Sequence, residues 1–520
     1  MRAVLFSFLL FACISVNAQQ PATLNLMPVP AKLQLKDGTF RITNQFTISV
    51  KSDASDSILY RAVNRAYQVL NRKTGVVFGI QYITLNDTLK NPSMQLSVDT
   101  KAGFKPGIDE SYTLNIDQDH VALTAPNSVG ALRGLQTLIQ LCTSDSQGYY
   151  FPCVSISDMP RFQWRGLMID VARHFISVDE MERNINAMAA VKMNVLHWHL
   201  SDDEGFRVES KIFPLLQEKG SNGDYYTQAQ LKEVVRYAQD RGIMVVPEFD
   251  MPGHSQSWFA GYPELASQPG PYRPGLRAQW MNEHPDPNRP KSGGMASMIT
   301  DLEAATFDPT NEKVYKFLNK FLGEMATIFP AGYVHVGADE NNGLAWKLNP
   351  KIVEWMTKHK IQTTDDLQLY FVGRVHDILK KHNRQLIGWE EIYSDKLPKD
   401  AIVHKWIPAS ISKFVKSHGE PEEFASHGYE TLISEGFYLD VFMPASFHYT
   451  NPAFMIETSP KILGGEGAQW SEIADNENIS LRMWPRAGAI AERLWSPLSV
   501  NDVPDMYRRL FILSDEFDQQ

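Results

Sequence analysis

The segment "RGLMIDVA" (residues 165–172) decides the fold, because it opens a regular series in which apolar strands alternate with helical stretches. A helix over 177–193, the strand "NVLHWHLSD" over 194–202 and a helix over 227–242 come next. Such alternation predicts βα units and a parallel sheet. With the first one included, eight strands are predicted, over residues 165–172, 194–202, 243–250, 333–340, 385–391, 401–407, 430–440 and 461–472. This count predicts an α/β fold of the (β/α)8 TIM-barrel type.

Polar side chains gather at one end of these strands. Each strand is apolar until its C-terminal end, and the C-terminal face of such a barrel carries the active site. Indole rings stack on the C–H faces of pyranoses, while carboxylates bind hydroxyls and transfer protons, so the residue types suit a sugar. The residues are Asp170, Asp202, Glu248, Asp250, Asp339, Glu340, Trp389, Glu390, Trp406, Tyr438, Asp440, Trp470 and Glu472.

The chain before the barrel has a different pattern. Short alternating segments, "FTISV" (46–50) and "MQLSV" (94–98), accompany helical stretches over 56–73 and 127–142. Strands and helices mixed in this way predict a small α+β domain. Pro160 marks the boundary. We therefore expect an accessory domain over residues 19–158 and the barrel over residues 159–520.

The first residues have the composition of an export signal. One Arg, an apolar stretch and small residues before Gln19 predict a signal peptide over residues 1–18, so we expect a periplasmic or secreted protein. A lipoprotein anchored through Cys13 is the alternative. No later stretch is apolar for long enough to span a bilayer. Cys142 and Cys153 then remain, either bonded or free. A net charge of -10 without a basic stripe argues against a nucleic-acid partner.

Two groups of residues allow more than one interpretation. His197 and His199 face one side of a strand near Asp202, which suits either a metal-dependent hydrolase or histidines held by hydrogen bonds. His254 follows a Pro-Gly turn, where it either tunes a carboxylate or stabilises its loop. Arg165 lies in an apolar context and needs an anion, several hydroxyls or a structural ion pair with a strand-end acid.

Five segments carry a resemblance to a known family. They are "RGLMIDVARHF" (165–175), "KMNVLHWHLSDDEGFR" (192–207), "VVPEFDMPGHS" (245–255), "HVGADE" (335–340) and "GWEE" (388–391). Together they resemble the family 20 glycoside hydrolases, the β-N-acetylhexosaminidases, over nearly the whole mature chain. The resemblance implies a small α+β domain before the barrel, exo-acting hydrolysis of a glycan, and no metal or other cofactor. The terminal sugar is N-acetylglucosamine, N-acetylgalactosamine or both.

The resemblance also implies roles for single residues. Glu340 would be the general acid and then the base, Asp339 would orient the 2-acetamido group, and Tyr438 would donate its hydroxyl to the acetamido oxygen. That oxygen would be the nucleophile, in the substrate-assisted variant of retaining hydrolysis. Trp389, Trp406 and Trp470 would form the wall of the pocket. Arg165, Asp440 and Glu472 would bind the sugar hydroxyls, and Asp202 and His254 would form a network that supports Glu340.

The chain departs from the family pattern in two places. It has Ala338 where the family usually has Gly, and Phe206 where the family usually has Trp. A methyl group at 338 would shift the backbone beside the acid pair. A Pro- and Gly-rich insertion over 265–307 follows the third strand, where we expect it to shape the outer part of the site.

Overall fold

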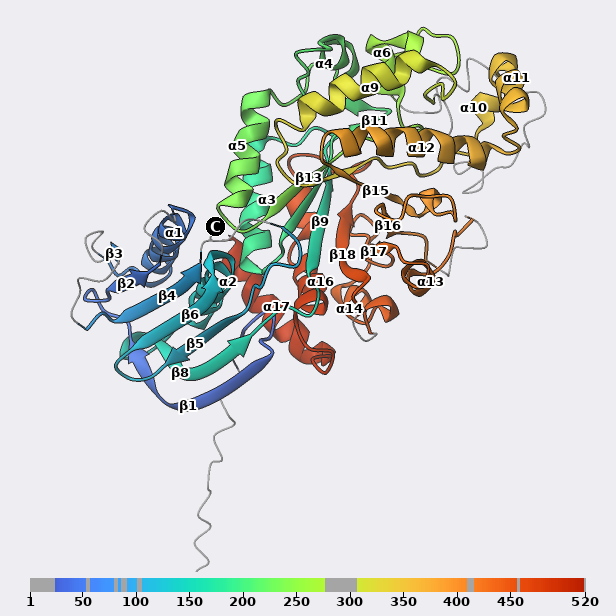
Figure 1. Ribbon diagram of the computed structural model, residues 1–520. Helices are drawn as coiled ribbons and strands as arrows, with labels where there is room; N and C mark the ends of the chain where they lie inside the picture. The colour runs from blue at the N-terminus through green and yellow to red at the C-terminus, as the bar shows by residue number, and fades with distance from the viewer. Residues whose placement is uncertain are drawn as a thin grey trace, which may run out of the picture.

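The largest element of the structure is a closed barrel of parallel strands surrounded by helices (Figure 1). The structure is a computed structural model that describes residues 24–52, 57–78, 83–85, 91–100, 105–275, 306–408, 416–455 and 459–518. Around the barrel the strand order is β10-β13-β14-β15-β16-β17-β18-β9. The bounds are β9 (Trp164–Asp170), β10 (Val195–His199), β13 (Met244–Glu248), β14 (Tyr333–His335), β15 (Gln385–Trp389), β16 (Ile402–Lys405), β17 (Glu430–Ile433) and β18 (Ile462–Gln469). The predicted TIM barrel is confirmed.

The interior of the barrel is apolar at one end and charged at the other. Side chains of a strand alternate between its two faces. On β10, Leu196 and Trp198 pack against the surrounding helices, so His197 and His199 share the interior with Val195. Buried apolar residues fill the N-terminal end of the interior, and we call them the apolar floor: Trp164, Val195, Met244, Val246, Ile387, Ile402, Leu432 and Leu463.

One acid crosses the interior next to the floor. Glu466 of β18 pairs in register with Gly166 of β9, and a Cβ atom at Gly166 would lie 2.4 Å from the Glu466 Cγ. Glycine is therefore required for the carboxylate to pass. Glu466 accepts a hydrogen bond of 2.6 Å from the Trp164 indole and lies 2.8 Å from His197 Nδ1.

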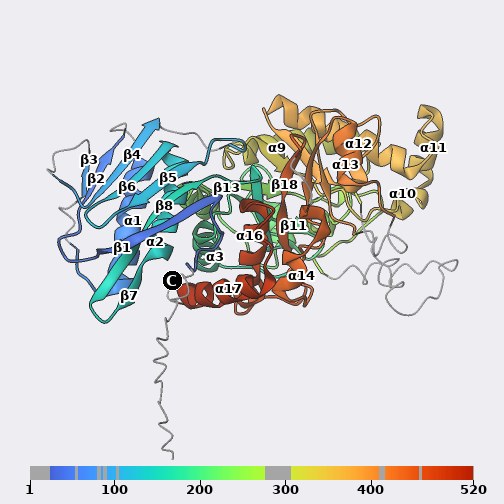
Figure 2. The same ribbon diagram turned by 90° about the horizontal axis from the view of Figure 1, so that it is seen from below.

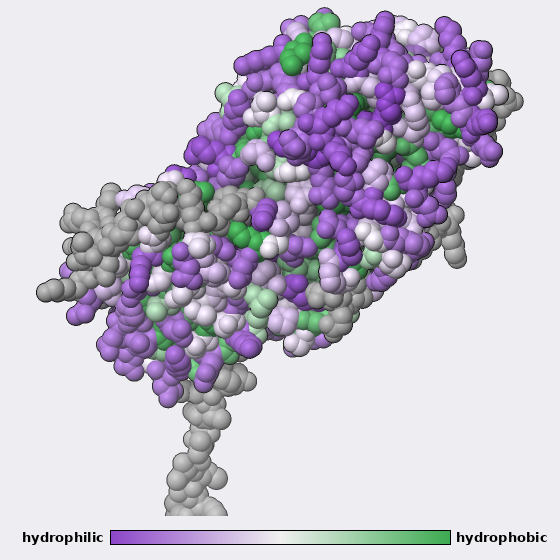
Figure 3. Space-filling model, viewed as in Figure 1, coloured by the Kyte–Doolittle hydropathy of each residue, from purple (hydrophilic) through white to green (hydrophobic). Residues whose placement is uncertain are grey.

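Helices cover the outside of the barrel. Their N-termini carry the expected caps: the Ser177 side chain accepts from Glu180 N–H, and Thr227 forms a capping box with Gln230. The helices are α3 (Val178–Ala190), α4 (Leu215–Gly220), α5 (Gln228–Gln239), α6 (Gln256–Gly261), α9 (Glu312–Met325), α10 (Leu344–Lys347), α11 (Pro350–His359), α12 (Thr364–Lys381), α13 (Pro421–Ser426), α14 (Ala445–Tyr449), α15 (Ile479–Met483), α16 (Arg486–Trp495) and α17 (Val503–Asp518). Hydrophilic residues dominate the visible surface over α9 and α12 (Figure 3), as an amphipathic covering helix requires.

The N-terminal part forms a second, open sheet beside the barrel (Figure 2). Its strand order is β1-β8-β5-β6-β4-β2-β3, with β7 paired to β8. The strands are β1 (Lys32–Arg41), β2 (Ile48–Lys51), β3 (Ile83–Leu85), β4 (Met94–Thr100), β5 (Tyr112–Ile116), β6 (Val121–Asn127), β7 (Thr143–Asp145) and β8 (Gly148–Asp158). Helices α1 (Ser57–Thr74) and α2 (Ser128–Leu141) share one apolar core with this sheet, which confirms the separate α+β unit.

The expectations on export, the insertion, the cysteines and membrane spans have different outcomes. The predicted signal peptide with Cys13 and most of the 265–307 insertion lie outside the described residues. Cys142 and Cys153 are both buried free thiols. None of the helices in the described ranges has both the length and the apolar character needed to cross a membrane.

Candidate active site

A left-handed turn after β14 delivers the two adjacent acids. Strand β14 ends at His335, earlier than predicted, because Gly337 and Ala338 have φ values of 63° and 74°, which an extended strand cannot adopt. Glu340 is also left-handed, with φ of 49°. The turn is held from both sides: Ala338 N–H donates to Asp250 Oδ1 at 3.2 Å, and Gln368 donates to the Ala338 carbonyl at 2.8 Å.

The close contact with Asp250 explains the residue types in this turn. A Cβ at Gly337 would lie 1.9 Å from Asp250 Oδ1, so only glycine fits there. Ala338 is fully buried in the apolar layer around the barrel, and its methyl group is accommodated despite the positive φ. The departure from the family's usual Gly therefore leaves the turn intact.

His254 links the acid pair to a buried carboxylate. Its Nε2 lies 3.5 Å from both Asp339 Oδ2 and Glu340 Oε2, and its Nδ1 lies 3.0 Å from Asp202. Burial raises the pKa of Asp202, but the Arg173 guanidinium at 2.8 Å and His254 outweigh burial and hold this pKa well below its usual range. Asp202 is therefore a carboxylate that orients the imidazole from behind, as the predicted supporting network requires.

The network continues into the barrel through Glu248. This buried carboxylate lies 2.6 Å from His199 Nδ1 and 2.9 Å from His197 Nε2, and it accepts 3.1 Å from the Trp389 indole N–H. His199 Nε2 lies 3.1 Å from Asp202. Burial opposes charge on His197, but Glu466 and Glu248 raise its pKa to about 9. Glu248 thus connects the barrel interior, one tryptophan of the site and the His254–Asp202 pair.

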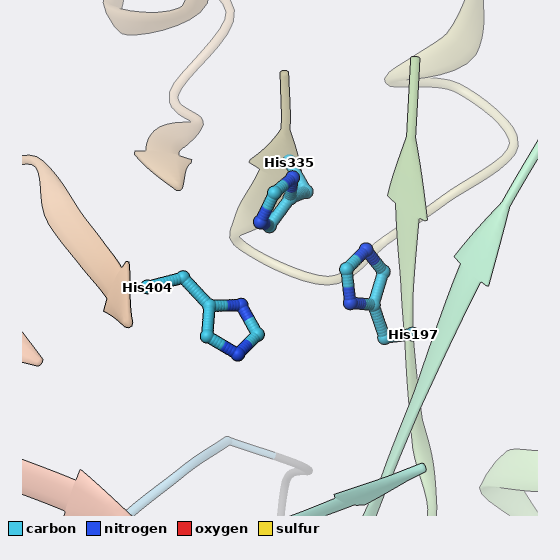
Figure 4. A group of neighbouring side chains, drawn as sticks. All are labelled: His197, His335 and His404. Atoms are coloured by element: carbon cyan, nitrogen blue, oxygen red, sulfur yellow. The ribbon is translucent and has the colours of Figure 1, made fainter. Parts of the chain in front are cut away.

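Three imidazoles in the interior are close enough to hold a metal ion (Figure 4). The nitrogens of His197, His335 and His404 lie within 4.8 Å of one another. However, both nitrogens of His197 face carboxylates, and His404 Nε2 lies 2.8 Å from the Ser434 hydroxyl. One nitrogen of each ring, His197 Nε2, His335 Nε2 and His404 Nδ1, has no well-aligned hydrogen-bond partner among the described residues. The His197 nitrogen is nevertheless occupied by Glu248 at 2.9 Å, which leaves two nitrogens for an ion that normally takes three protein ligands.

Aromatic rings line the same end of the barrel. Trp389 and Trp470 have ring centroids 6.1 Å apart, and Trp406 lies 6.4 Å from Tyr438. The Trp406 indole donates to the Glu391 carboxylate at 3.1 Å. All four predicted aromatic residues are therefore assembled at the strand ends.

Two carboxylates of the site have exceptional surroundings. Asp339 Oδ1 and Asp440 Oδ1 are buried and have no hydrogen-bond partner among the described residues. Burial, and then Glu472, raise the pKa of Asp440 to about 7. Burial likewise raises the pKa of Asp339. Burial and the neighbouring Asp440 raise the pKa of Tyr438 well above its usual value, so its hydroxyl stays protonated and can donate.

One residue predicted for the site, Arg165, lies at the opposite end of the barrel. Arg165 lies at the N-terminal end of β9, whereas the site lies at the C-terminal end. It is fully buried, and it pairs with Glu110 of the N-terminal unit at 2.6 Å and donates to the Phe162 carbonyl at 2.8 Å. The prediction that Arg165 holds sugar hydroxyls is therefore wrong. The structural ion pair considered as its alternative is present, but with Glu110 rather than a strand-end acid.

The arginine that reaches the site is Arg173, which the sequence interpretation missed. Its guanidinium pairs with Asp202 at 2.8 Å, lies 3.3 Å from Asp170 and sits 4.8 Å from the centre of the Trp470 ring. The signal was available, because Arg173 follows the strand-end Asp170 by three residues within the "RGLMIDVARHF" segment. Glu248 and Asp250 were predicted at the strand ends but received no individual role, and Glu391 was not singled out.

Comparison with known proteins agrees with this architecture. The model of the glycosyl hydrolase family 20 catalytic domain matches residues 162–498, and a beta-acetyl hexosaminidase like model matches residues 26–141. The mouse beta-hexosaminidase subunit beta is 32% identical over 530 residues, which cover 98% of this chain and 92% of the mouse protein.

Solved structures are similar over almost the whole chain. A Flavobacterium johnsoniae chitobiase superposes with a TM-score of 0.85 at 39% identity, covering 95% of this chain and 73% of that one. A Vibrio harveyi exo-β-N-acetylglucosaminidase in complex with N-acetylglucosamine gives a TM-score of 0.78 at 27% identity, covering 96% and 79%. The chain therefore belongs to glycosyl hydrolase family 20 and is a glycoside hydrolase of the β-N-acetylhexosaminidase type.

Proposed function

We propose that the chain is an exo-acting enzyme that removes terminal non-reducing N-acetylhexosamines with retention of configuration, using the 2-acetamido group of the substrate as nucleophile. One observation carries the proposal. Asp339 and Glu340 lie in the same turn, and both carboxyl groups contact the His254 imidazole. In addition, Asp339 Oδ1 is buried and has no hydrogen-bond partner among the described residues. Such an oxygen is an acceptor for the acetamide N–H.

In the first step Glu340 donates a proton to the glycosidic oxygen. The acetamido carbonyl oxygen attacks the anomeric carbon as the bond to the leaving group breaks, which gives an oxazolinium ion. Asp339 accepts the acetamide N–H and offsets the developing positive charge. The protonated Tyr438 hydroxyl donates to the acetamido oxygen and positions it for attack.

In the second step water opens the oxazolinium ion. Glu340, now a carboxylate, takes a proton from the water as its oxygen attacks the anomeric carbon. Two inversions at one carbon give net retention. His254 contacts both acids throughout, and Asp202 holds the imidazole in place.

The remaining residues would bind the sugar ring. Trp389, Trp406 and Trp470 supply indole faces, while Asp440 and Glu472 accept from hydroxyl groups. We assign to Arg173 the hydroxyl contact that the sequence suggested for Arg165, because its guanidinium lies over Trp470. The Vibrio relative binds N-acetylglucosamine, so this sugar is our first expectation, with N-acetylgalactosamine as the alternative.

Replacement of Glu340 tests the acid–base assignment. Glu340→Gln should lose at least about a thousandfold in kcat/KM on a disaccharide, whose leaving group needs a proton. It should lose much less on a nitrophenyl N-acetylglucosaminide, whose leaving group needs none. Glu354→Gln, on the exposed face of α11, is the matched control and should match wild type. Near-normal activity of Glu340→Gln on both substrates would exclude the role.

A substrate without the acetamido group tests the nucleophile. The nitrophenyl glucoside with a 2-hydroxyl should be almost inert with the wild type, because no group is then placed to attack the anomeric carbon. Rapid turnover of this analogue would rule out substrate assistance. Asp339→Asn should slow hydrolysis of the N-acetyl substrate with good and poor leaving groups alike, unlike Glu340→Gln.

A metal-dependent hydrolase is the competing function, because His197, His335 and His404 converge. We propose instead that no metal is required. Activity should survive prolonged treatment with a chelator, and elemental analysis of the purified enzyme should find no stoichiometric metal. Loss of activity with the chelator and its recovery with zinc would establish the competing function.

Export is the remaining part of the proposal. We propose that residues 1–18 are removed, that residues 19–158 form the accessory domain, and that the enzyme works in the periplasm or outside the cell. The mature N-terminus should be Gln19. Recovery of a lipid-modified form beginning at Cys13 would instead establish membrane anchoring.

A further inference from the structure

An arginine-rich cavity of about 300 Å³ lies where the two units of the chain meet, far from the acid pair in the sequence. Helices α1 and α2 of the N-terminal unit form one side, and α3 and α5 of the barrel form the other (Figure 1). Its walls carry Arg65 and Arg72 from α1, Arg133 from α2, and Arg241 directly after α5.

The lining contains positive charge and no negative charge. Besides the four arginines, its polar side chains are those of Gln68, Gln136, Asn186 and Tyr237, and no carboxylate is among the lining residues. A chain with a net charge of -10 would not gather four guanidinium groups around one cavity by its average composition. The local excess of positive charge therefore needs an explanation.

The acids nearest the cavity are already engaged. Asp240 receives two hydrogen bonds from Arg61, at 2.6 and 3.0 Å, and Glu110 is shared by Arg133 and Arg165. Within the part of the chain that the structure describes, Arg65 donates to the Asp240 backbone carbonyl and to no carboxylate.

Among the described residues, neither Arg72 nor Arg241 has an ion-pair partner. The charge of Glu182 acts on Arg241 only through a longer-range electrostatic interaction. The Arg241 Nε donates to the Asn186 side chain at 2.6 Å. Three of the four arginines, Arg65, Arg72 and Arg241, thus form no ion pair with any carboxylate in the described ranges of the chain.

The Arg65 and Arg241 guanidinium groups repel one another in a partly buried space, whereas the Arg72 side chain is exposed. Burial, and then the neighbouring Arg241, lower the pKa of Arg65 to about 10. Arg133 is only 1% exposed, and it already donates to Glu110 and to the Arg241 and Gly242 carbonyls, so the anion would rest on the other three arginines. Folding would place such charges together at a cost, which a bound anion would offset.

We propose that this cavity binds a small dianionic oxyanion, a phosphate or a sulfate, either free or carried on one sugar. Guanidinium forks match the oxygens of such groups, and several forks converging on one site suit two negative charges. The volume is at the lower limit for ligand sites and admits no more than a monosaccharide derivative. The bound anion would join α1 and α2 to α3 and α5.

Binding of defined probes to the whole protein tests the proposal. Inorganic phosphate, inorganic sulfate, glucose 6-phosphate and glucose are titrated calorimetrically at pH 8 in chloride of constant ionic strength. Phosphate and sulfate should bind saturably at one site, and glucose should not bind there. Tighter binding of glucose 6-phosphate than of phosphate identifies a phosphorylated sugar as the ligand type, whereas equal binding identifies the free anion. Absence of saturable binding by every oxyanion would overturn the proposal.

Variants locate the binding in the cavity. The double variant Arg65→Gln with Arg72→Gln should bind phosphate about a hundredfold more weakly, about tenfold for each lost guanidinium. Arg183→Gln is the control, because this arginine lies on α3 outside the lining and pairs with Glu180. Unchanged affinity in the double variant would refute the site.

The melting temperature without oxyanion keeps the test interpretable. The double variant should melt in chloride no lower than wild type, since two like charges have been removed. Phosphate should raise the melting temperature of wild type and of Arg183→Gln, but not that of the double variant.

Discussion

Asp440 should make the protein less stable as the pH rises from about 4 to about 7, and Asp440→Asn should remove this effect. In the folded protein its pKa is about 7, against an ordinary value of 3.8, because it is buried beside Glu472. The folded state therefore binds more protons than the unfolded state between these two values. Compared with a protein that has a non-titrating residue at position 440, wild type has an unchanged free energy of unfolding below this window. The free energy falls as the pH rises through the window, and the full loss is reached above pH 7.

The size of the effect follows from the shift. About three pKa units at 1.36 kcal/mol each set an upper limit of about 4 kcal/mol, and partial exposure of the side chain reduces this to roughly 2–4 kcal/mol. Unfolding entropy is about 2.1 cal/mol/K per residue, or ~0.75 kcal/mol/K for a barrel of this length. Asp440→Asn should thus melt about 3–5 °C above wild type at pH 8, with little difference at pH 4.5.

Thermal melting of both proteins from pH 4.5 to 8.5 is the assay. Asp145→Asn is the control, because hydrogen bonding to Arg41 lowers the pKa of Asp145 to about 2, below the whole window. Its difference from wild type should not change with pH. A pH-independent difference for Asp440→Asn, or one that shrinks as the pH rises, would refute the reasoning. The variant should also raise KM, since Asp440 is proposed to bind a sugar hydroxyl.

Three further perturbations test other parts of the structure. Gly337→Ala should lower kcat at least about a hundredfold, because its Cβ would lie 1.9 Å from Asp250 Oδ1 and displace the acid pair. Ala338→Gly is the control and should keep kcat within a few-fold of wild type. Equal rates for the two variants would contradict this prediction. Glu248→Gln removes the counter-ion of two buried imidazoles and should lower the free energy of unfolding by about 3–5 kcal/mol in denaturant titrations. A denaturation midpoint equal to that of wild type would contradict this. Glu110→Gln leaves Arg133 of the N-terminal unit and Arg165 of the barrel buried without this carboxylate, so calorimetry should show the melting temperature falling by several degrees. An unchanged melting temperature would show that these two ion pairs contribute nothing to stability.

The barrel could be predicted because its signal is local. Apolar strands at regular intervals, each ending in acids or aromatic residues, are visible without knowledge of contacts. The same regularity explains the assembly of Trp389, Tyr438 and Trp470, since parallel strands bring their C-terminal ends to one face. Asp339 and Glu340 were likewise predicted at the end of a strand, and the structure places them in the turn that follows β14.

The error at Arg165 shows what local patterns leave open. Arg165 and Arg173 belong to one segment, but β9 runs from Trp164 to Asp170 and separates them to opposite ends of the barrel. Only the strand bounds decide which arginine meets the site. The left-handed turn at Ala338 was also missed, because an alanine with positive φ has no sequence signal.

Contacts across the barrel were beyond prediction for another reason. Glu248 of β13 meets His197 and His199 of β10 and Trp389 of β15, and such pairings depend on register around a closed sheet. The arginine-rich cavity likewise combines Arg65 and Arg241, which stand far apart in the sequence.

Gly166 and Glu466 have a consequence for the evolution of this barrel. The acid crosses the interior only because its neighbour lacks a side chain, and it binds both Trp164 and His197 once it has crossed. A larger residue at 166 would exclude the acid, while loss of the acid would leave a void beside the glycine and remove a partner from two buried side chains. Neither position can therefore change first without loss, so among relatives of this chain the two residues should be inherited together or replaced together.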